Sequence, residues 1–444
     1  MFGRTRFHLA TALNGEFGFG ERLRETQRLE YAPCSDFDLH VQSKLRSSLS
    51  LAKHGSAWYA DRLPESTTVD PFELLADCPV LTKAELQANA SLLRAANYRG
   101  RVQVKTTGGS TGQPVTVFKD PQAVSFERAA TWAAYLSYGI QIGERCIRFW
   151  GTPTTRERTR RSALADFATN RTTLSAFALD ESTLERHWSQ CVSLKAPFYY
   201  GYASMLTAFA NFIAGRGYDG RSAGARVVVS TSEVLARPDR ARIEQTFGVK
   251  VRDEYGCGEF GPIAYECEAG LLHIAANNVF VEVVTASGSG AKYGESGKLV
   301  VTDLNNRVMP LIRFEVGDFA ERGPADCSCG RRSPTLARVW GREYDFIEDA
   351  DGRKYHGEYL VYLFEDLAKK GCSIKQFQVV QYSDRSIDVC IVPGENDTGL
   401  LELVQTEVES RLPGVSVQCR VVPNVQRRPS GKTPLIVRNP ERRR

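Results

Sequence analysis

A run of glycines and hydroxyl side chains between two alternating segments is the feature that most constrains this chain. The run is Thr106-Thr107-Gly108-Gly109-Ser110-Thr111-Gly112-Gln113-Pro114. Residues 101–105 and 115–119 on either side alternate apolar and polar side chains, so each segment is predicted to be a strand. The run is therefore predicted to be the turn of a hairpin. A glycine-rich backbone with hydroxyl donors beside it can wrap around a phosphate group.

Two interpretations of this loop stay open on its residues alone. A Walker P-loop leads from a strand into a helix and ends in Gly-Lys-Ser/Thr, whereas Gly112 is followed here by Gln113-Pro114 and a second predicted strand. These differences argue against a Walker ATPase. A phosphate-binding hairpin and a plain turn of small residues remain, because a glycine motif taken alone is a weak indication of function.

Length and composition limit the class of protein. A chain of 444 residues is too long for one ordinary core, so two or three domains are expected. The hydrophobic share of 42% and the charged share of 25% are typical of soluble globular proteins, and no apolar run is long enough to span a bilayer. The basic N-terminus is followed by only a short apolar stretch, which argues against a secretory signal. We therefore expect a cytoplasmic protein.

Charge and cysteine content restrict the partners. The net charge of +5 is mild and the basic residues form no stripe with aromatics, so neither nucleic acid nor a membrane is expected as a partner. A mild positive charge suits an enzyme that handles anionic phosphates. Eleven cysteines without a signal indicate reduced thiols or metal ligands, and not a disulfide framework. A homodimer is compatible with these bounds.

Helix-like and strand-like segments alternate through the middle of the chain. After a largely helical start, at about 1–96, helical periodicity and short apolar strands alternate from 122 to 253. This order predicts α/β layers around a largely parallel sheet. The last hundred residues read helix, two strands, helix and strand, which predicts a small α+β domain. We place the boundary at Gly341-Arg342, which gives domains at 1–341 and 342–444.

Four further segments carry residue types suited to a nucleotide. The segment 253–259 follows a predicted strand, and loops at the carboxyl ends of strands bind ligands in α/β sheets. Within it, Tyr255 offers a ring for stacking and Glu259 offers a carboxylate for Mg²⁺. Asp318, which follows a glycine, can accept both hydroxyls of a ribose. The other two segments are Gly341-Arg342-Glu343-Tyr344-Asp345 and Pro429-Ser430-Gly431-Lys432.

The ordered set of these motifs resembles the adenylate-forming superfamily, and within it the branch of phenylacetate–CoA ligase and its capsule-biosynthesis relatives. The resemblance extends from about Gln42 to Ile436. Its further supporting segments are weak one by one and specific together: 79–83, 201–204, 231–233, 301–304 and 309–313. It implies a large N-terminal adenylating domain of layered α/β sheets and a small, mobile α+β C-terminal domain.

The resemblance implies which residues bind ATP. The β- and γ-phosphates would be held by the loop residues Thr106, Thr107, Gly108, Gly109, Ser110, Thr111 and Gly112. The adenine side would be lined by Ser232, Glu233, Asp253, Glu254, Tyr255 and Gly256. The ribose hydroxyls would be bound by Asp318. Arg342 would lie close to the nucleotide, and Asp345 matches the hinge about which the small domain rotates.

The resemblance also implies the catalytic residues, which are Lys432, Arg313 and Glu259. A carboxylate oxygen attacks the α-phosphorus of ATP and pyrophosphate leaves, so two anions must approach each other. Mg²⁺ on Glu259 and the ammonium of Lys432 would supply positive charge where negative charge grows. Lys432 would bridge the substrate carboxylate and the α-phosphate, and Arg313 would lie close to the nucleotide. A thiol or an amine then takes the acyl group and AMP leaves.

Three cysteines and one histidine form a second constellation, at Cys267-x₅-His273 and Cys327-x-Cys329. Three thiols and one imidazole fit a closed tetrahedral zinc site, which is structural and not catalytic. The resemblance supports zinc, since similar cysteine clusters occur in this branch. The alternative is three unrelated buried thiols and a capped histidine. Because Cys267 follows Glu259 and Cys327 follows Asp318, the metal would join the Mg²⁺ segment to the ribose segment.

The acid and the acceptor are the least constrained partners. Aromatic rings at Tyr135, Trp150, Tyr200 and Tyr202 would line a pocket for an aryl or apolar acid, and core packing explains the same rings equally well. No cation for a distal charge on the acid is evident in the sequence. The polar turn at 349–356 departs from the phenylacetate ligase pattern and leaves the acceptor open.

The leading function is therefore an ATP- and Mg²⁺-dependent acid–CoA ligase. The alternatives are an ATP-dependent amide ligase, which transfers the acyl group to an amine, and an adenylyltransferase. A non-catalytic binding module is a third class, against which the presence of Lys432, Glu259 and Asp318 argues.

Overall fold

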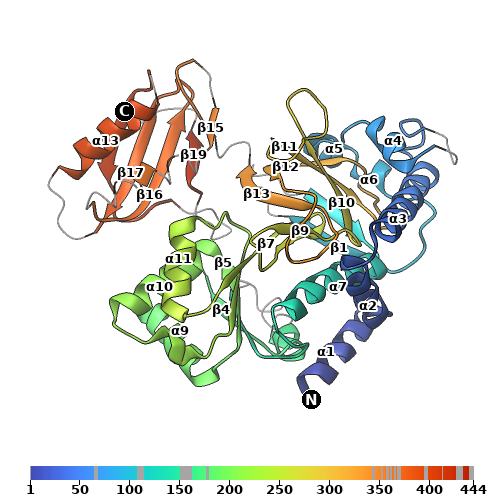
Figure 1. Ribbon diagram of the computed structural model, residues 1–444, viewed down its shortest axis with the longest axis horizontal. Coiled ribbons are helices and arrows are strands. Elements are labelled where there is room, and N and C mark those ends of the chain that lie inside the picture. Colours follow the sequence, from blue (N-terminus) through green and yellow to red (C-terminus); the bar gives the residue numbers. More distant parts are fainter. Residues whose placement is uncertain are drawn as a thin grey trace. The chain divides into compact units, whose positions relative to one another are not determined.

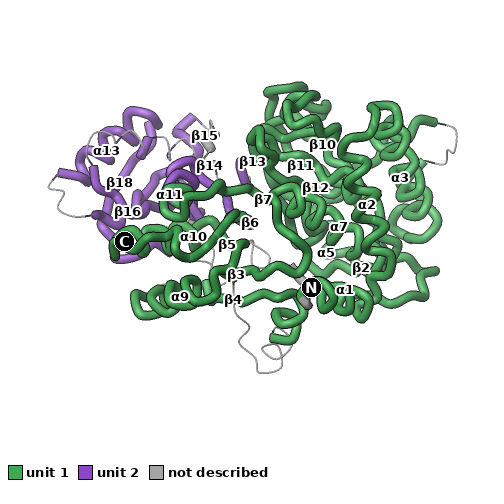
Figure 2. The backbone as a smooth tube through the Cα atoms, turned by 60° about the horizontal axis from the view of Figure 1, so that its bottom comes forward, with its two compact units in different colours: residues 1–232, 243–339 green, residues 233–242, 340–444 purple. Residues whose placement is uncertain are grey.

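The computed structural model describes most of the chain. The described residues are 2–64, 69–107, 115–150, 163–176, 180–342, 346–351, 354–356, 360, 363–364, 367, 372–394, 399–412, 414–426 and 434–439. They form two compact units, coloured separately in Figure 2, one of residues 1–232 with 243–339 and one of residues 233–242 with 340–444. Within the described residues, no helix is both long and apolar enough to cross a membrane.

Six helices open the chain, and polar caps fix where the shorter ones begin. They are α1 (Phe2–Leu13), α2 (Phe19–Glu30), α3 (Cys34–Gly55), α4 (Pro71–Ala76), α5 (Lys83–Ala88) and α6 (Ala90–Leu93). Asp70 caps α4 by accepting from the backbone N–H of Phe72. Thr82 and Glu85 form a reciprocal capping box at the start of α5.

The hairpin predicted around the glycine run is confirmed on both of its strands. Strand β1 (Gln103–Thr107) pairs antiparallel with β2 (Val115–Lys119), with Thr107 opposite Val115. The alternation of β2 places Val115 and Val117 in the core. The turn itself, residues 108–114, lies outside the described residues.

An eleven-stranded sheet forms the centre of the first unit, in the order β10-β11-β12-β13-β9-β8-β7-β6-β5-β3-β4. One half is parallel and consists of β4 (Arg171–Ser175), β3 (Cys146–Trp150), β5 (Phe198–Tyr202), β6 (Val227–Thr231) and β7 (Val251–Cys257). The other strands are β8 (Gly261–Glu266), β9 (Leu272–Ile274), β10 (Val279–Val284), β11 (Ser296–Asp303), β12 (Phe314–Arg322) and β13 (Thr335–Arg342).

The predicted parallel arrangement therefore holds for one half of the sheet only. The pairs β7–β8, β8–β9, β9–β13, β10–β11 and β11–β12 are antiparallel. Short turns join β7 to β8 and β8 to β9, and such turns permit only antiparallel neighbours, whereas parallel strands need a longer crossover.

Helices cover both faces of the parallel half (Figure 1). On one face lies α7 (Pro121–Ser137), whose Tyr135 ring packs on Phe198 of β5 with centroids 4.9 Å apart. On the other face lies α10 (Ala203–Gly215), whose Phe209 packs on Phe149 of β3 at 5.0 Å. The same layer contains α9 (Glu181–Leu194), η1 (Gly220–Ala223) and α11 (Arg237–Phe247). The prediction of an α/β class is confirmed.

The second unit contains a four-stranded sheet in the order β18-β17-β16-β19. Its elements are β14 (Phe346–Glu348), β15 (Lys354–His356), β16 (Ile374–Tyr382), β17 (Ile387–Pro393), α13 (Leu400–Arg411), β18 (Val417–Val421) and β19 (Ile436–Asn439). Val404 and Val408 of α13 share a fully buried core with Val389 and Ile391 of β17. The sequence analysis did not foresee β19 or the short hairpin of β14 and β15.

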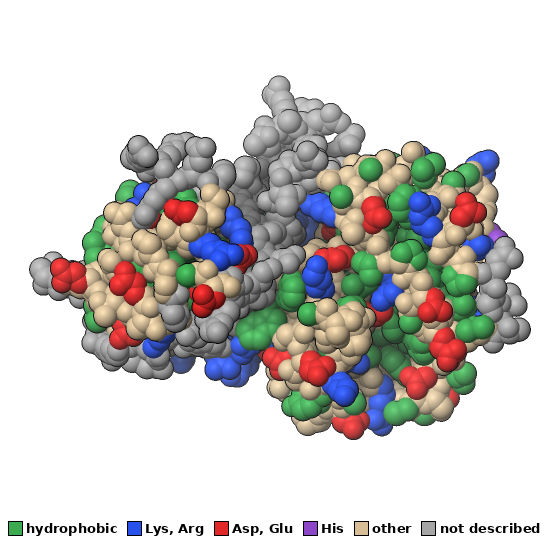
Figure 3. Space-filling view, turned by 90° about the horizontal axis from the view of Figure 1, so that it is seen from above, with side chains coloured by type: hydrophobic (Ala, Val, Ile, Leu, Met, Phe, Trp, Pro, Cys, Tyr) green, Lys and Arg blue, Asp and Glu red, His purple; other side chains and the backbone are tan. Residues whose placement is uncertain are grey.

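Acidic and basic side chains are dispersed over one face of the molecule (Figure 3). On the face shown in Figure 3, lysine and arginine side chains lie among aspartate and glutamate side chains on both units. This pattern agrees with the mild net charge of +5.

Candidate active site

Tyr255 and Asp318, both predicted to contact the nucleotide, meet in the structure. Asp318 lies on β12 after Gly317, whose φ of 82° is one that glycine adopts without strain. The Tyr255 hydroxyl, on β7, donates to Asp318 Oδ2 at 2.7 Å. Asp318 is 8% exposed, so this contact fixes the direction of its carboxylate. The pair joins a ring that can stack on a base to a carboxylate that can accept ribose hydroxyls.

The segment 253–259 lies mostly in a strand, and its prediction as a loop is corrected. β7 continues to Cys257, and only residues 258–260 form the turn into β8. Gly256 permits this pairing, since a Cβ there would lie 2.5 Å from the carbonyl oxygen of Gly261. Glu259 therefore lies on a tight hairpin turn, half-buried, at one end of β7. Burial and the neighbouring Glu259 raise the pKa of the Cys257 thiol, which disfavours it as a nucleophile.

Glu254 links residues predicted for the adenine side to residues predicted for the acid. Its carboxylate accepts from the hydroxyls of Tyr135 at 2.7 Å and Tyr200 at 2.9 Å. Thr231 of β6 donates a longer bond, at 3.3 Å. Burial raises the pKa of Glu254, and the tyrosine hydroxyls offset only part of that rise. Side chains from three elements, α7, β5 and β6, thus converge on one carboxyl group of β7.

Aromatic rings form a wall beside Glu254. Trp150 of β3 stacks on Tyr200 with an interplanar angle of 17° and centroids 5.7 Å apart, and it lies 4.4 Å from Tyr202. On the same strand, the guanidinium carbon of Arg148 lies over the Trp150 ring, 4.1 Å from the ring centroid. The four predicted acid-pocket residues are therefore on one face of the parallel half, together with an arginine that sequence reasoning missed.

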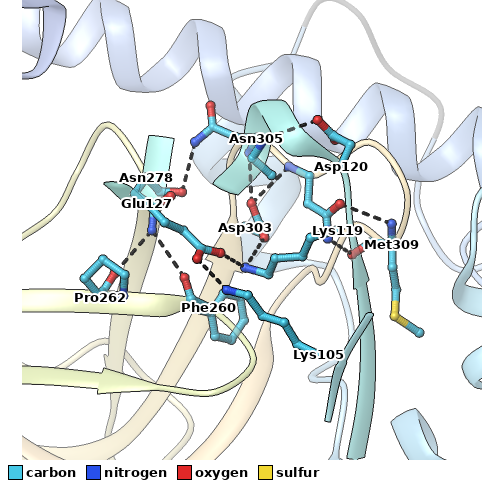
Figure 4. Close-up of polar contacts among 12 residues, drawn as sticks. Lys105, Lys119, Asp120, Glu127, Phe260, Pro262, Asn278, Asp303, Asn305 and Met309 are labelled. Atoms are coloured by element: carbon cyan, nitrogen blue, oxygen red, sulfur yellow. Dashed lines mark hydrogen bonds and ion pairs between the residues drawn. The ribbon is translucent and has the colours of Figure 1, made fainter. Parts of the chain in front are cut away.

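The stem of the glycine hairpin is anchored by a buried cluster of charges (Figure 4). Lys105 of β1 and Lys119 of β2 both bind the carboxylate of Glu127 on α7, Lys105 at 2.5 Å. Lys119, only 1% exposed, also lies 3.5 Å from Asp303 of β11. Burial opposes ionisation of Glu127, but the two ammonium groups outweigh it and lower its pKa. The base of the predicted phosphate loop is therefore fixed to α7 and to the large sheet.

Gly261 connects this cluster to the turn that carries Glu259. A Cβ at Gly261 would lie 2.7 Å from Glu127 Oε2, and its φ is 72°. Only glycine meets both conditions without strain. Glu127 therefore lies against both the stem of the predicted phosphate hairpin and the residue that follows the predicted Mg²⁺ turn.

Arg313 makes contacts that favour a structural role over its predicted place near the nucleotide. Its guanidinium forms a two-point ion pair with Glu282, at 3.0 and 3.1 Å. It also donates to the carbonyl oxygens of Ala76 and Cys78 at 2.8 and 2.7 Å. These contacts use four of the five N–H donors of a guanidinium, and the residue is 8% exposed.

The remaining predicted residues divide into described and undescribed. Ser232 and Glu233 follow β6, and Ser232 has a φ of 68°. The backbone N–H of Asp253 donates to Glu266 at 2.7 Å. Gly108, Gly109, Ser110, Thr111, Gly112, Asp345 and Lys432 lie outside the described residues, as do the side chains of Thr106, Thr107 and Arg342.

The predicted zinc ligands converge. One ligand atom from each of Cys267, His273, Cys327 and Cys329 lies within 4.8 Å of all the others. Cys267 Sγ and Cys327 Sγ are 3.7 Å apart, which agrees with the sulfur–sulfur edge of about 3.8 Å expected for Zn–S bonds of about 2.3 Å. Cys329 Sγ lies 3.2 Å from His273 Nε2.

The surroundings of His273 also fit a metal ligand. Its Nδ1 lies 3.0 Å from the carbonyl oxygen of Ser333, a partner that fixes the proton there and leaves Nε2 for a metal. Burial lowers the pKa of His273 to about 4, so the ring is neutral. Cys267 follows β8 and His273 lies on β9, whereas Cys327 and Cys329 follow β12. A metal here would hold these strand ends together.

Two known proteins are similar to this chain in sequence. CapK of Staphylococcus aureus is 22% identical over 343 residues, covering 74% of this chain and 72% of that protein. Phenylacetate-coenzyme A ligase of Thermus thermophilus is 33% identical over 113 residues, covering 24% of this chain and 25% of that one. No family model matches the chain.

A solved structure extends the likeness to almost the whole chain. 2-Hydroxyisobutyryl-CoA ligase, in its postadenylation state with R3-HIB-AMP, superposes with a TM-score of 0.74 at 18% identity and covers 93% of this chain and 91% of that one. At this level of identity the likeness shows a shared fold. The fold is that of an adenylate-forming enzyme, as predicted.

Two features of the candidate site were missed by the sequence analysis. Arg148 lies in the segment Cys146-Ile147-Arg148-Phe149-Trp150, where alternation places it on the face of Trp150, and that parity was the available signal. The charge cluster at Lys119 had no such signal, because a lysine in an alternating strand is ordinarily solvated.

Proposed function

We propose that this protein activates a carboxylic acid with ATP and transfers the acyl group to CoA. The observation that carries the proposal is the contact of Tyr255 with Asp318, which presents a stacking ring and a buried carboxylate to one nucleoside. Two relatives support it by their names. One is phenylacetate-coenzyme A ligase, and the other, 2-hydroxyisobutyryl-CoA ligase, has been solved with 2-HIB-AMP and CoA in the thioesterification state.

In the first step an oxygen of the acid attacks the α-phosphorus of ATP, and the bond from that phosphorus to the leaving pyrophosphate breaks. The roles proposed for this chain are to bind and to screen. Asp318 accepts the two ribose hydroxyls while Tyr255 fixes its carboxylate. Backbone N–H groups of residues 106–112 bind the departing phosphates, and the ammonium of Lys432 screens the two anions. When bound, Mg²⁺ would supply further positive charge at the phosphates, held by Glu259.

In the second step a thiolate attacks the acyl carbon, the carbon–oxygen bond to the phosphate breaks, and AMP leaves. The nucleophile comes from the cosubstrate, so no side chain of the protein needs to attack. A half-buried Cys257 with a raised pKa is consistent with that assignment.

We further propose that Cys267, His273, Cys327 and Cys329 hold one structural zinc ion. Three thiolates and an imidazole leave no open position for a water or substrate. The ion would stabilise the ends of β8, β9 and β12, and Asp318 lies on the last of these strands.

The test combines a panel of acids with ATP and Mg²⁺, and follows pyrophosphate release. Acyl-CoA in the products, identified by mass spectrometry, is the expected result when CoA is added. Products formed only with amines would instead favour the amide ligase. K432A should lose adenylate formation, with a rate decrease of about 10²–10³ or more, and should still transfer the acyl group from a presynthesised adenylate. Adenylation by K432A at the wild-type rate would contradict the assignment of Lys432.

A further inference from the structure

Arg148 is half-buried and has one buried polar atom that no described residue satisfies. It occupies the middle of β3, and its guanidinium covers the ring of Trp150 at 4.1 Å. Arg148 Nε is buried and has no hydrogen-bond partner among the described residues. Burial lowers the pKa of Arg148, which records the cost of holding its charge there. A buried N–H donor without an acceptor is costly in a folded protein.

A second unsatisfied polar atom lies next to Arg148. Thr173 of β4 is its register partner in the parallel pair, so both side chains leave the sheet on one face. Thr173 Oγ1 is also buried without a partner among the residues that the structure describes. Arg171, the nearest other cation on β4, is already paired with Asp166 at 2.7 Å. Two donors are thus left for something outside the described protein.

The face that carries these donors is the face proposed for the acid. Register places Tyr200 of β5 beside Arg148, and Tyr200 stacks on Trp150. Tyr200 in turn donates to Glu254, whose chain neighbour Tyr255 binds Asp318. Glu254, Tyr200 and Arg148 therefore follow one another across β7, β5 and β3 on one face of the sheet.

We propose that Arg148, with Thr173, binds an anionic group at the end of the acid remote from the carboxylate that is activated. This inference rests on the proposed function and names its substrate class: a planar or aryl acid with a second carboxylate or another anionic acceptor. The rings of Trp150 and Tyr200 would line the body of the acid, and the guanidinium of Arg148 would bind the anionic group at its far end. It replaces the expectation of an apolar acid.

The test compares matched aryl acids that differ only in the far substituent, which is a carboxylate, a hydroxyl or a methyl group. Wild-type protein is assayed with ATP and Mg²⁺ for pyrophosphate release, and kcat/KM is measured for each acid. The expected preference for the carboxylate over the methyl compound is about tenfold to hundredfold, the range for a charged hydrogen bond. In R148M that preference should disappear, whereas R148K should keep part of it because the charge remains.

A stability readout separates this role from a structural one. If Arg148 holds the fold together, its replacement should lower the unfolding temperature. If its role is to bind the acid, R148M removes a group with an unsatisfied buried Nε, and the unfolding temperature should be unchanged or higher. If R148M does not fold, T173V is measured in its place and should weaken the same preference; an undiminished preference in T173V would then overturn the inference.

The outcomes are distinct. Equal kcat/KM for the carboxylate and methyl acids in wild-type protein, or a preference that R148M retains, overturns the inference and leaves the ligase function intact. Failure of every acid to release pyrophosphate rejects the proposed function and the inference with it.

Discussion

The hydroxyl of Tyr255 on β7 donates to Oδ2 of Asp318 on β12 at 2.7 Å, although 63 residues separate them in the chain. The two strands are not neighbours in the sheet. A side chain on one strand therefore sets the direction of a carboxylate on another, as the proposed binding of one nucleoside by both residues requires.

Removal of that hydroxyl should weaken ATP binding more than it slows the chemistry. In Y255F the ring remains for stacking, but Asp318 loses the bond that orients it. We expect the KM for ATP to rise about tenfold, with a smaller change in kcat, as for one lost hydrogen bond to a charged group. Steady-state kinetics with varied ATP measures it. Y293F is the control, because Tyr293 is 71% exposed; equal effects in both variants would contradict the role of Tyr255.

Removal of the buried ammonium at Lys119 should destabilise the first unit severely. K119M leaves Glu127 with Lys105 alone and Asp303 without a cation, and breaking a buried pair on one side costs about 3–5 kcal/mol. Urea unfolding measures the loss. The matched control is K250M, whose ammonium pairs with Glu244 on the surface and should change the free energy of unfolding by less than about 1 kcal/mol. Similar losses in the two variants would refute the importance of burial.

Glu254 should make stability depend on pH in one direction. Its folded pKa is raised above the ordinary 4.5 by burial, so the folded state retains a proton that the unfolded state releases. The unfolded chain then binds fewer protons, and the free energy of unfolding falls as pH rises from about 4.5 through the folded pKa. E254Q, which cannot ionise, should gain stability relative to wild type across that window. Urea unfolding at several pH values tests this, and a constant difference between the two proteins would rule it out.

Loss of a single metal ligand should release zinc and lower thermal stability. Metal analysis of protein purified without added zinc should find about one ion per chain, as four ligands of this kind require. C327S should lose the ion and unfold at a lower temperature. C34S is the control, because Cys34 is exposed and lies apart from the cluster. Full activity and unchanged unfolding of metal-free wild-type protein would contradict a structural zinc site.

The sequence was sufficient where the signal is local. Alternation around the glycine run predicts β1 and β2, and the types of residue at Cys267 and His273 predict a metal cluster. It failed where non-local pairing decides the outcome. From its strand position Lys119 is expected to face solvent, but it forms a buried ion pair with Glu127. Arg313 is expected to lie close to the nucleotide, but its guanidinium pairs with Glu282. No local pattern records which side chain another segment will cover.

Alternate side chains of β3 point to opposite faces of the sheet. Ile147 and Phe149 are fully buried against the α10 layer, whereas Arg148 and Trp150 face the opposite side, toward the proposed acid. Along the five residues of β3, side chains proposed to contact the acid therefore alternate with side chains that pack in the hydrophobic core, and the two sets face different layers of the fold. A library randomised at Arg148, Trp150 and Thr173 would sample new selectivities for the acid and leave the hydrophobic layer unchanged. This strand is therefore a favourable place for directed evolution and for divergence among related proteins.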